Sequence, residues 1–279
     1  MKNYFTKQTT YTILKLVNIT RKEMIKIYSK IPVTIFAKEN NLLKQTSDKT
    51  ILILHQLSTL SNMKDTTLLS IKYLIEQINY KDNDQIRNEI KTILLKLELD
   101  NLIKINSKIN KSNELIIIDI SNLKQLDRFI LLEDNEYEEI INSTKNKKEQ
   151  LNLLKLLLYF KYKSYKRPYK ESIYDTGGKA NCCTQDYITI VKDTNITIKN
   201  INKYIDKLKE LNLITYTNIG YKILDGKITQ CNNIYVVNSL CNKDEIEIEL
   251  NQAIKQQKYM YEQLGYKITK TKNKKINKP

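Results

Sequence analysis

The strongest constraint on the fold is a pattern that the sequence contains twice. Residues 84–103 and 195–214 each predict a helix that runs into the tripeptide Asn-Leu-Ile, which starts at Asn101 in one copy and at Asn212 in the other. When the tripeptides are aligned, the apolar positions of the two helices coincide at the spacing of one helix face. The coinciding pairs are Ile90 with Ile201, Leu94 with Ile205 and Leu97 with Leu208. The chain therefore contains two copies of one structural unit.

The segments after the two helices extend the repeat. In both copies an alternating apolar strand, a polar turn rich in Lys and Asn, and a second strand follow, with the second strands expected at 115–120 and 233–237. A DNA-reading helix followed by a two-stranded wing is the layout of a winged helix-turn-helix. The sequence thus predicts an α+β fold, mainly helical, with two winged helix-turn-helix domains in tandem and a basic C-terminal tail.

Composition shifts divide the chain into five expected parts. These are an N-terminal helical segment at 1–40, a first winged-helix domain at 41–122, a connector at 123–148, a second winged-helix domain at 149–240, and a C-terminal helix with a basic tail at 241–279. The tail is expected to be disordered from Lys267 on, because the residues from there hold many lysines and few apolar groups.

Local signals place the elements inside these parts. In the first domain we expect helices at 48–60, 70–78 and 84–99 and a strand at 66–69; in the second, helices at 151–160, 187–194 and 197–212. The connector is expected to hold a helix at 123–132. Asp225-Gly226 is a strong two-residue turn signal and predicts the tip of the second wing.

Charge indicates the class of partner. Lys and Arg number 47 against 31 Asp and Glu, which gives a formal net charge of +16. Such an excess attracts polyanions and makes their binding depend on salt. The alternative is that an AT-rich coding sequence raised the Lys, Asn and Ile content without any nucleic-acid partner. The clustering of charge is therefore more informative than its total.

The helix at 197–212 is the best candidate for reading DNA. Its expected core face is Ile198, Ile201, Ile205, Leu208 and Leu211. The side chains left facing outward on its first turns are Thr197, Lys199, Asn200, Asn202 and Lys203. Asn can pair bidentately with adenine and Lys can reach guanine or phosphate, so this set suits base reading. A merely solvated helix face is the alternative.

Three further groups are candidate DNA contacts. They are Gln85, Arg87, Asn88 and Lys91 in the first domain; Lys163, Lys166, Arg167 and Lys170 in a Tyr- and Lys-rich insertion at 161–170; and Lys108, Lys111, Lys222 and Lys227 in the wings. The acidic residues Asp82, Asp84 and Glu89 reduce the positive charge of the first group, so we expect the first domain to bind DNA more weakly. Its alternative role is pairing with a second copy of the chain. An exposed charged loop is the alternative for the insertion.

Catalytic, metal and membrane classes are not expected. The chain has a single histidine, His55, and its cysteines at 182, 183, 231 and 241 lack zinc spacing, so we expect free thiols, no metal and no cofactor. Gly177-Gly178-Lys179 does not fit a P-loop, and the chain is not expected to be an enzyme. No run of about 18 apolar residues occurs, so we expect no membrane span and a cytoplasmic location.

The second copy resembles a known group of proteins. Asp-Thr-Asn-Ile-Thr at 193–197, the helix end at 204–214 and Asn-Asn-Ile-Tyr-Val-Val at 232–237 resemble the winged helices of bacterial plasmid and phage replication proteins. Two such domains in a basic chain of this length are similar in architecture to plasmid replication initiators. In that family one winged helix commonly mediates dimerisation, while both can bind repeated sites at the origin.

The resemblance implies a sequence-specific double-stranded DNA-binding protein that initiates plasmid-type replication in a bacterium. It would recognise origin repeats as a homodimer, associate with the nucleoid or plasmid, and recruit host replication proteins. A transcriptional regulator, or a plasmid partition or transfer accessory protein, is the alternative DNA-binding role. A winged-helix protein-interaction module is the alternative from another class.

Overall fold

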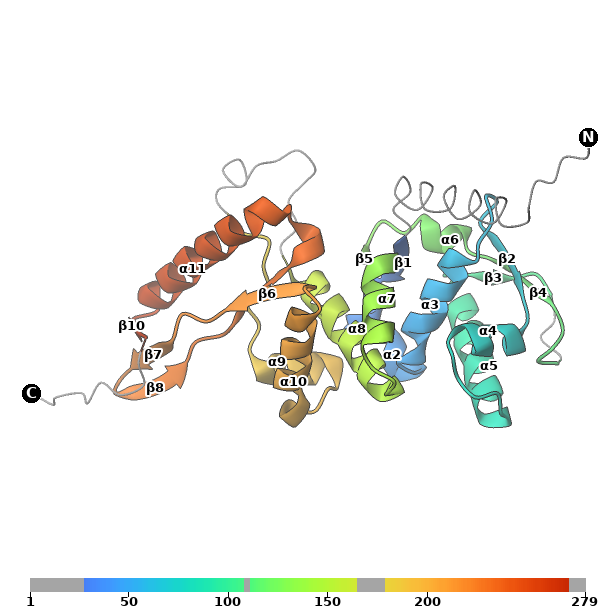
Figure 1. Ribbon diagram of the computed structural model, residues 1–279, viewed down its shortest axis with the longest axis horizontal. Coiled ribbons are helices and arrows are strands. Elements are labelled where there is room, and N and C mark those ends of the chain that lie inside the picture. Colours follow the sequence, from blue (N-terminus) through green and yellow to red (C-terminus); the bar gives the residue numbers. More distant parts are fainter. Residues whose placement is uncertain (1–27, 108–110, 165–178, 271–279) are drawn as a thin grey trace, which may run out of the picture.

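The computed structural model describes residues 28–107, 111–164 and 179–270, which form an α+β fold with small sheets among its helices (Figure 1). The sheets of this part of the chain have two or three strands each and all their pairings are antiparallel. The helices of the two repeated copies lie side by side, and an arm made of α11 (Ile246–Gln263) and a small three-stranded sheet extends from the second copy.

The first copy follows the expected order. Its elements are α3 (Lys49–Thr59), β2 (Thr66–Leu69), α4 (Ile71–Gln77), α5 (Asp84–Leu99), β3 (Lys104–Ile105) and β4 (Ile116–Asp119). Side-chain caps explain where two of the helices begin, because Ser70 accepts a hydrogen bond from the Tyr73 N–H and Asn83 accepts one from the Ile86 N–H. The strands pair in the order β2-β4-β3. The predicted strand at 66–69 and helix at 84–99 are confirmed.

The second copy repeats this arrangement. Its elements are α8 (Lys147–Lys163), α9 (Tyr187–Thr194), α10 (Ile198–Glu210), β6 (Ile214–Thr217) and β9 (Ile234–Val237). Strand β9 pairs with β6, and an isolated bridge joins its Tyr235 to Cys183, where a first strand would lie. Asn195 adopts a left-handed conformation with φ of 56° and so makes the sharp turn between α9 and α10. The two copies thus share the order of their helices and an antiparallel pair of strands after the last helix.

The second copy carries an additional small sheet between β6 and β9. Strands β7 (Tyr221–Leu224) and β8 (Lys227–Gln230) form a hairpin whose turn residues, Asp225 and Gly226, both have positive φ, as the sequence predicts. Strand β10 (Lys267–Thr269) pairs with β7, so the expectation of a disordered tail starting at Lys267 is wrong for these residues. Residues 271–279 of the expected tail lie outside the described residues.

The close approach of β10 depends on one glycine. Gly220 has φ of 106°, and a Cβ atom there would lie 2.3 Å from the Thr269 carbonyl oxygen. Helix α11 (Ile246–Gln263) covers this sheet and buries Ala253 and Tyr261 against Ile219 and Ile234 in a small core of its own.

The connector is a folded part of the core. It contains α6 (Ser121–Lys124), β5 (Phe129–Glu133) and α7 (Asp134–Ser143), so the helix expected at 123–132 is wrong from residue 125 on. The reason is tertiary, because β5 pairs with β1 (Tyr28–Pro32) from the other end of the chain. Residues 28–32, expected in a helical segment, are therefore strand as well. After β1 come a 3-10 turn at Val33–Phe36 and the short α2 (Leu42–Gln45), while residues 1–27 lie outside the described part.

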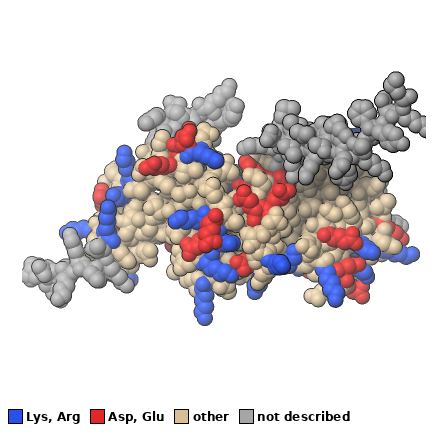
Figure 2. Space-filling model, viewed as in Figure 1, with Lys and Arg blue, Asp and Glu red and all other residues tan. Residues whose placement is uncertain are grey.

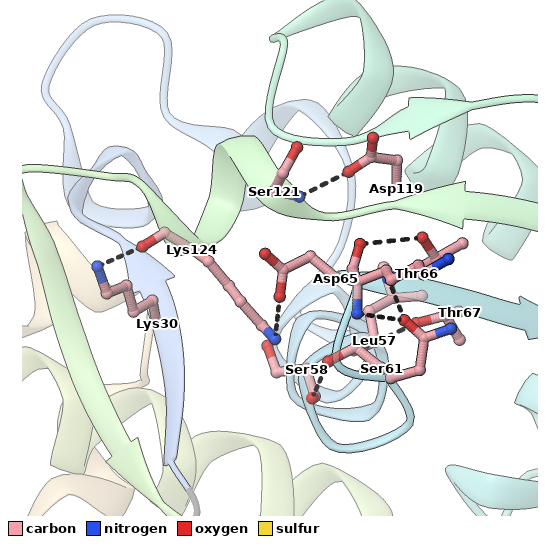
Figure 3. A network of polar contacts seen from close by, with 12 residues as sticks. Lys30, Leu57, Ser58, Ser61, Asp65, Thr66, Thr67, Asp119, Ser121 and Lys124 are labelled. Carbon is pink, nitrogen blue, oxygen red and sulfur yellow. Dashed lines mark hydrogen bonds and ion pairs between the residues drawn. The ribbon is translucent and has the colours of Figure 1, made fainter.

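A polar network fixes α6 against both β1 and the first copy (Figure 3). The Lys124 ammonium lies 2.5 Å from an Asp65 carboxylate oxygen, and the Lys30 ammonium donates to the Lys124 carbonyl. The Ser121 N–H donates to Asp119 at 2.8 Å, and the hydrogen bonds from Ser121 lower the pKa of that carboxyl. These contacts stabilise the junction where the chain leaves the first copy.

Helix α8 joins the two copies into one core. Every side chain from residue 150 to 161 is buried, and a continuous cluster of buried apolar side chains extends from Ile31 to Val237. Two lysines of α8 make polar ties to other elements: Lys155 lies 2.6 Å from Asp48 at the start of α3, and Lys161 lies 2.5 Å from Glu136 of α7. Helix α8 therefore belongs to the packing of both copies.

Candidate nucleic-acid interface

The first turns of α10 present a row of exposed polar side chains. Thr197, Lys199, Asn200 and Asn202 are all exposed, as predicted, and none of their side chains has a hydrogen-bond or ion-pair partner within the described part of the chain. Lys203 is exposed too, but its ammonium lies 3.0 Å from a Glu149 carboxylate oxygen of α8. The row is therefore free to bind, with Lys203 partly engaged.

The opposite face of α10 corrects one detail of the prediction. Ile201, Ile205 and Leu208 are buried as expected, but Ile198 is 56% exposed. Ile198 lies in the first helical turn, immediately beyond the sharp bend at Asn195, and this turn projects past the core. Together with Ile188 of α9 it lines an open hollow of about 600 Å³ that also borders Lys199 and Asn200. The exposed end of α10 is thus part apolar and part polar.

The corresponding helix of the first copy is less available. Gln85 and Asn88 are exposed, but Arg87 makes two 2.7 Å hydrogen bonds to Asp82 and one of 3.0 Å to Asp84. The hydrogen bond from Arg87 also lowers the pKa of Asp82, so that carboxyl stays charged. Lys91 is half-buried. The electrostatic character of this surface is therefore close to neutral.

The remaining candidates have different surroundings. Lys163 lies 3.3 Å from Asp193 and stacks over the Tyr162 ring, whereas Lys166, Arg167, Lys170 and Lys108 lie outside the described residues. Lys161, at the start of the basic insertion, is only 1% exposed and so belongs to the core. In the two segments predicted to be wings, Lys111 and Lys227 are exposed. The Lys222 ammonium lies over two rings, 4.4 Å from the centre of Tyr261 and 5.1 Å from that of Tyr266.

The two third helices are oriented alike. Strands β3 and β6, which follow α5 and α10, lie above these helices in Figure 1, so both N-terminal ends lie along the lower edge of the molecule. Figure 2 shows Lys and Arg side chains along this edge with acidic groups between them. The edge therefore offers the exposed ends of both helices to one extended ligand.

A groove next to α10 was not found from the sequence. It has a volume of about 560 Å³ and is bordered by α9, α10 and the strand segments around β6 and β8. Gln185 and Gln230 line it together with Asn202, yet they come from three distant parts of the chain. No local sequence pattern indicates that these side chains lie close together in the fold.

Cys183 and His55 are buried, and Cys182 is partly buried. Burial raises the pKa of Cys183 to about 12 and that of Cys182 to about 11, so both stay protonated, and thiols bind metals poorly in that form. His55 is buried, stacks on Tyr137 and accepts or donates a 2.9 Å hydrogen bond with Ser29. Across residues 28–107, 111–164 and 179–270, no group of three or more His, Cys, Asp or Glu side chains could hold a metal ion. In the same ranges no helix has the length and apolar character needed to cross a bilayer.

The comparison with known proteins identifies no family for the chain. No protein-family model matches the chain, and a search of curated proteins finds no match.

Proposed function

We propose that both copies are winged helix-turn-helix units and that the chain binds double-stranded DNA sequence-specifically through α10. The observation that carries this proposal is the row Thr197, Lys199, Asn200 and Asn202 on the N-terminal half of α10, where the side chains are exposed and have no polar partner among the described residues. In a helix-turn-helix this is the part of the recognition helix that contacts base edges. Amide and ammonium side chains supply the donors and acceptors that discriminate bases in the major groove.

The second element of the proposal is a supporting role for the first copy. Because Arg87 is bound by Asp82 and Asp84, α5 contributes less to affinity than α10. Its orientation along the same edge still allows Gln85 and Asn88 to approach the same duplex. The formal net charge of +16 favours this binding and makes it dependent on salt.

The biological role that we propose is initiation of plasmid-type replication, by recognition of origin repeats and recruitment of host replication proteins. The support for it is the resemblance of residues 193–214 and 232–237 to winged helices of plasmid and phage replication proteins. Binding to direct repeats beside an origin supports this role, whereas binding to a single operator upstream of a promoter supports a regulator instead.

The experiment measures binding of the purified chain to DNA fragments tiled across its own replicon at two salt concentrations. Lys199→Ala combined with Asn200→Ala removes two exposed side chains from α10 and should abolish footprinted binding without altering the fold. The matched control is Asn251→Ala with Lys255→Ala, because these residues are also exposed, have no hydrogen-bond or ion-pair partner in the described ranges, and lie on α11. The control changes the net charge equally and should leave specific binding unchanged.

Two results would contradict the proposal. Equal, weak binding to every fragment would leave only non-specific attraction by a basic chain. Equal effects of the α10 pair and the α11 pair would show that charge, and not the position of the helix, determines binding. A circular dichroism spectrum of each variant confirms that the fold is retained.

A further inference from the structure

The groove next to α10 has a composition unlike the rest of this basic chain. Its lining, all of it within the described ranges, contains no Lys or Arg, although the chain carries 47 such residues. Six of the side chains that line it are amides, namely Gln185, Asn202, Asn218, Gln230, Asn232 and Asn233. Tyr187, Tyr216 and the carboxylate of Asp186 complete its polar surface. The groove therefore selects for hydrogen-bonding capacity and not for negative charge.

The inner amides of the groove are fixed by hydrogen bonds. The Asn218 amide donates to the Cys231 carbonyl at 2.8 Å and to the Asn233 side-chain oxygen at 2.7 Å. Asn233 in turn donates to the hydroxyl oxygens of Tyr187 and Tyr235 at 3.0 and 3.1 Å. This network orients the floor of the groove before any ligand arrives. A preorganised site loses less conformational entropy on binding.

The rim of the groove is free. The side chains of Gln185, Asn202 and Gln230 have no hydrogen-bond partner in the described part of the chain, although each can both donate and accept. They come from the segment before α9, from α10 and from β8, so three separate parts of the fold contribute free amides to the groove. A ligand with several donors and acceptors on one edge would satisfy them together.

Electrostatics makes phosphate an unfavourable group to bind inside the groove. Asp186 lies at the N-terminus of α9; burial would raise its pKa, but hydrogen bonds from the Thr189 N–H and hydroxyl outweigh this and lower it. The carboxylate is therefore charged and repels an anion, and no cation lines the groove to offset it. The same carboxylate can still accept a hydrogen bond from an amino group.

We propose that this groove binds a single unpaired nucleobase, whose edge is read by the rim amides of Gln185, Asn202 and Gln230. The inference rests on the proposed DNA binding, because Asn202 of the groove also belongs to the exposed row of α10. Amide side chains pair with base edges, and a planar base fits a site of this volume next to tyrosine rings. The phosphates of the same nucleotide remain outside, toward the lysines of α10.

The experiment compares two fluorescent single strands of about 12 nucleotides, a length that covers typical single-strand binding sites. One carries all four bases, and the other has the same sugar-phosphate backbone without bases. The chain should bind the base-containing strand about tenfold more tightly, because stacking and base hydrogen bonds are lost in the other. Gln185→Leu with Gln230→Leu should bring the ratio of the two dissociation constants close to one.

The controls separate this proposal from the duplex proposal. Gln77→Leu with Gln263→Leu changes two exposed glutamines that lie outside the groove and have no side-chain partner within residues 28–107, 111–164 and 179–270, and should leave the ratio unchanged. The groove variant should bind duplex DNA as the unaltered chain does, since Gln185 and Gln230 lie off α10. If the unaltered chain does not bind duplex DNA but still prefers the base-containing strand, only the duplex proposal is overturned.

Other outcomes overturn the groove proposal. Equal affinity for the two strands, or a base preference that survives in the Gln185 and Gln230 variant, would show that the groove binds no base. Competition by free deoxynucleosides distinguishes the two sources of a base. Competition supports a site that accepts an isolated nucleoside, and a base preference without competition supports one that requires the strand.

Discussion

The buried pair between Lys161 and Glu136 allows a quantitative test of how the two copies are joined. Both side chains are at most 2% exposed, and the Lys161 ammonium also donates to the Leu131 carbonyl at 2.8 Å. Glu136 accepts further hydrogen bonds from the Ser239 hydroxyl at 2.6 Å and the Glu133 N–H at 2.9 Å. Lys161→Met keeps most of the side-chain volume but leaves this carboxylate buried without its cation.

The expected cost is large, because an uncompensated buried charge typically lowers the free energy of unfolding by about 3–5 kcal/mol. With a urea m-value of about 3 kcal/mol/M, the unfolding midpoint should fall by about 1 M or more. Lys163→Met is the matched control on the same helix. Lys163 and Asp193 are 3.3 Å apart and both partly exposed, so its loss should cost about 1 kcal/mol or less.

Urea unfolding followed by circular dichroism measures both variants. Adding Glu136→Gln to Lys161→Met removes the unpaired charge and should recover part of the lost stability. A loss of stability in Lys161→Met no larger than that in Lys163→Met would contradict this explanation. A double variant no more stable than Lys161→Met would also contradict it, because the buried charge would then not be the cause of the lost stability.

Three further predictions concern backbone, pH and salt. Gly220→Ala should lower the free energy of unfolding by about 1–3 kcal/mol and expose the amides of β10 to hydrogen exchange. The control Gly226→Ala, with nothing within 4 Å of its new Cβ, should lower the free energy of unfolding by about 1 kcal/mol. Equal effects of the two variants would contradict the close contact of Gly220 with Thr269. Burial lowers the pKa of His55 from 6.5 to about 4, so the unfolded chain binds the extra proton first and stability should fall between pH 6.5 and 4, by up to about 3 kcal/mol. His55→Gln should flatten that part of the stability profile in thermal unfolding, and an unchanged slope would refute the assignment. Lys227→Ala should weaken DNA binding equally for all sequences and reduce the salt slope by about 1, whereas a sequence-selective loss would show that Lys227 reads bases.

Elements with strong local signals could be predicted from the sequence, and those defined by distant partners could not. Ser70 and Asn83 are recognisable caps, and the helices after them begin where expected. Residues 129–133 alternate in burial only because β1 pairs with them, about 100 residues away in the chain. Similarly, Lys267–Thr269 looks like a basic tail until β7 supplies a partner.

The same distinction applies to the candidate site. Exposure of Lys199, Asn200 and Asn202 follows from helix periodicity, because the buried residues of α10 define the other face. The pairing of Arg87 with Asp82 could have been predicted, because the sequence shows acidic residues at the start of α5. The ring contacts of Lys222 and the convergence of Gln185 with Gln230 depend on the folded arm and could not be foreseen.

The sharing of α8 by both copies has a consequence for bivalent binding. Two binding units on a flexible tether can reach sites at many separations, and the tether length sets their effective concentration. Here Lys155 ties α8 to Asp48 at the start of α3, so the separation of the two units is set by side-chain packing. If the chain binds DNA through both units as proposed, it should tolerate little change in site spacing. Half a helical turn of inserted DNA, about 5 base pairs, would place the second site on the opposite side of the duplex.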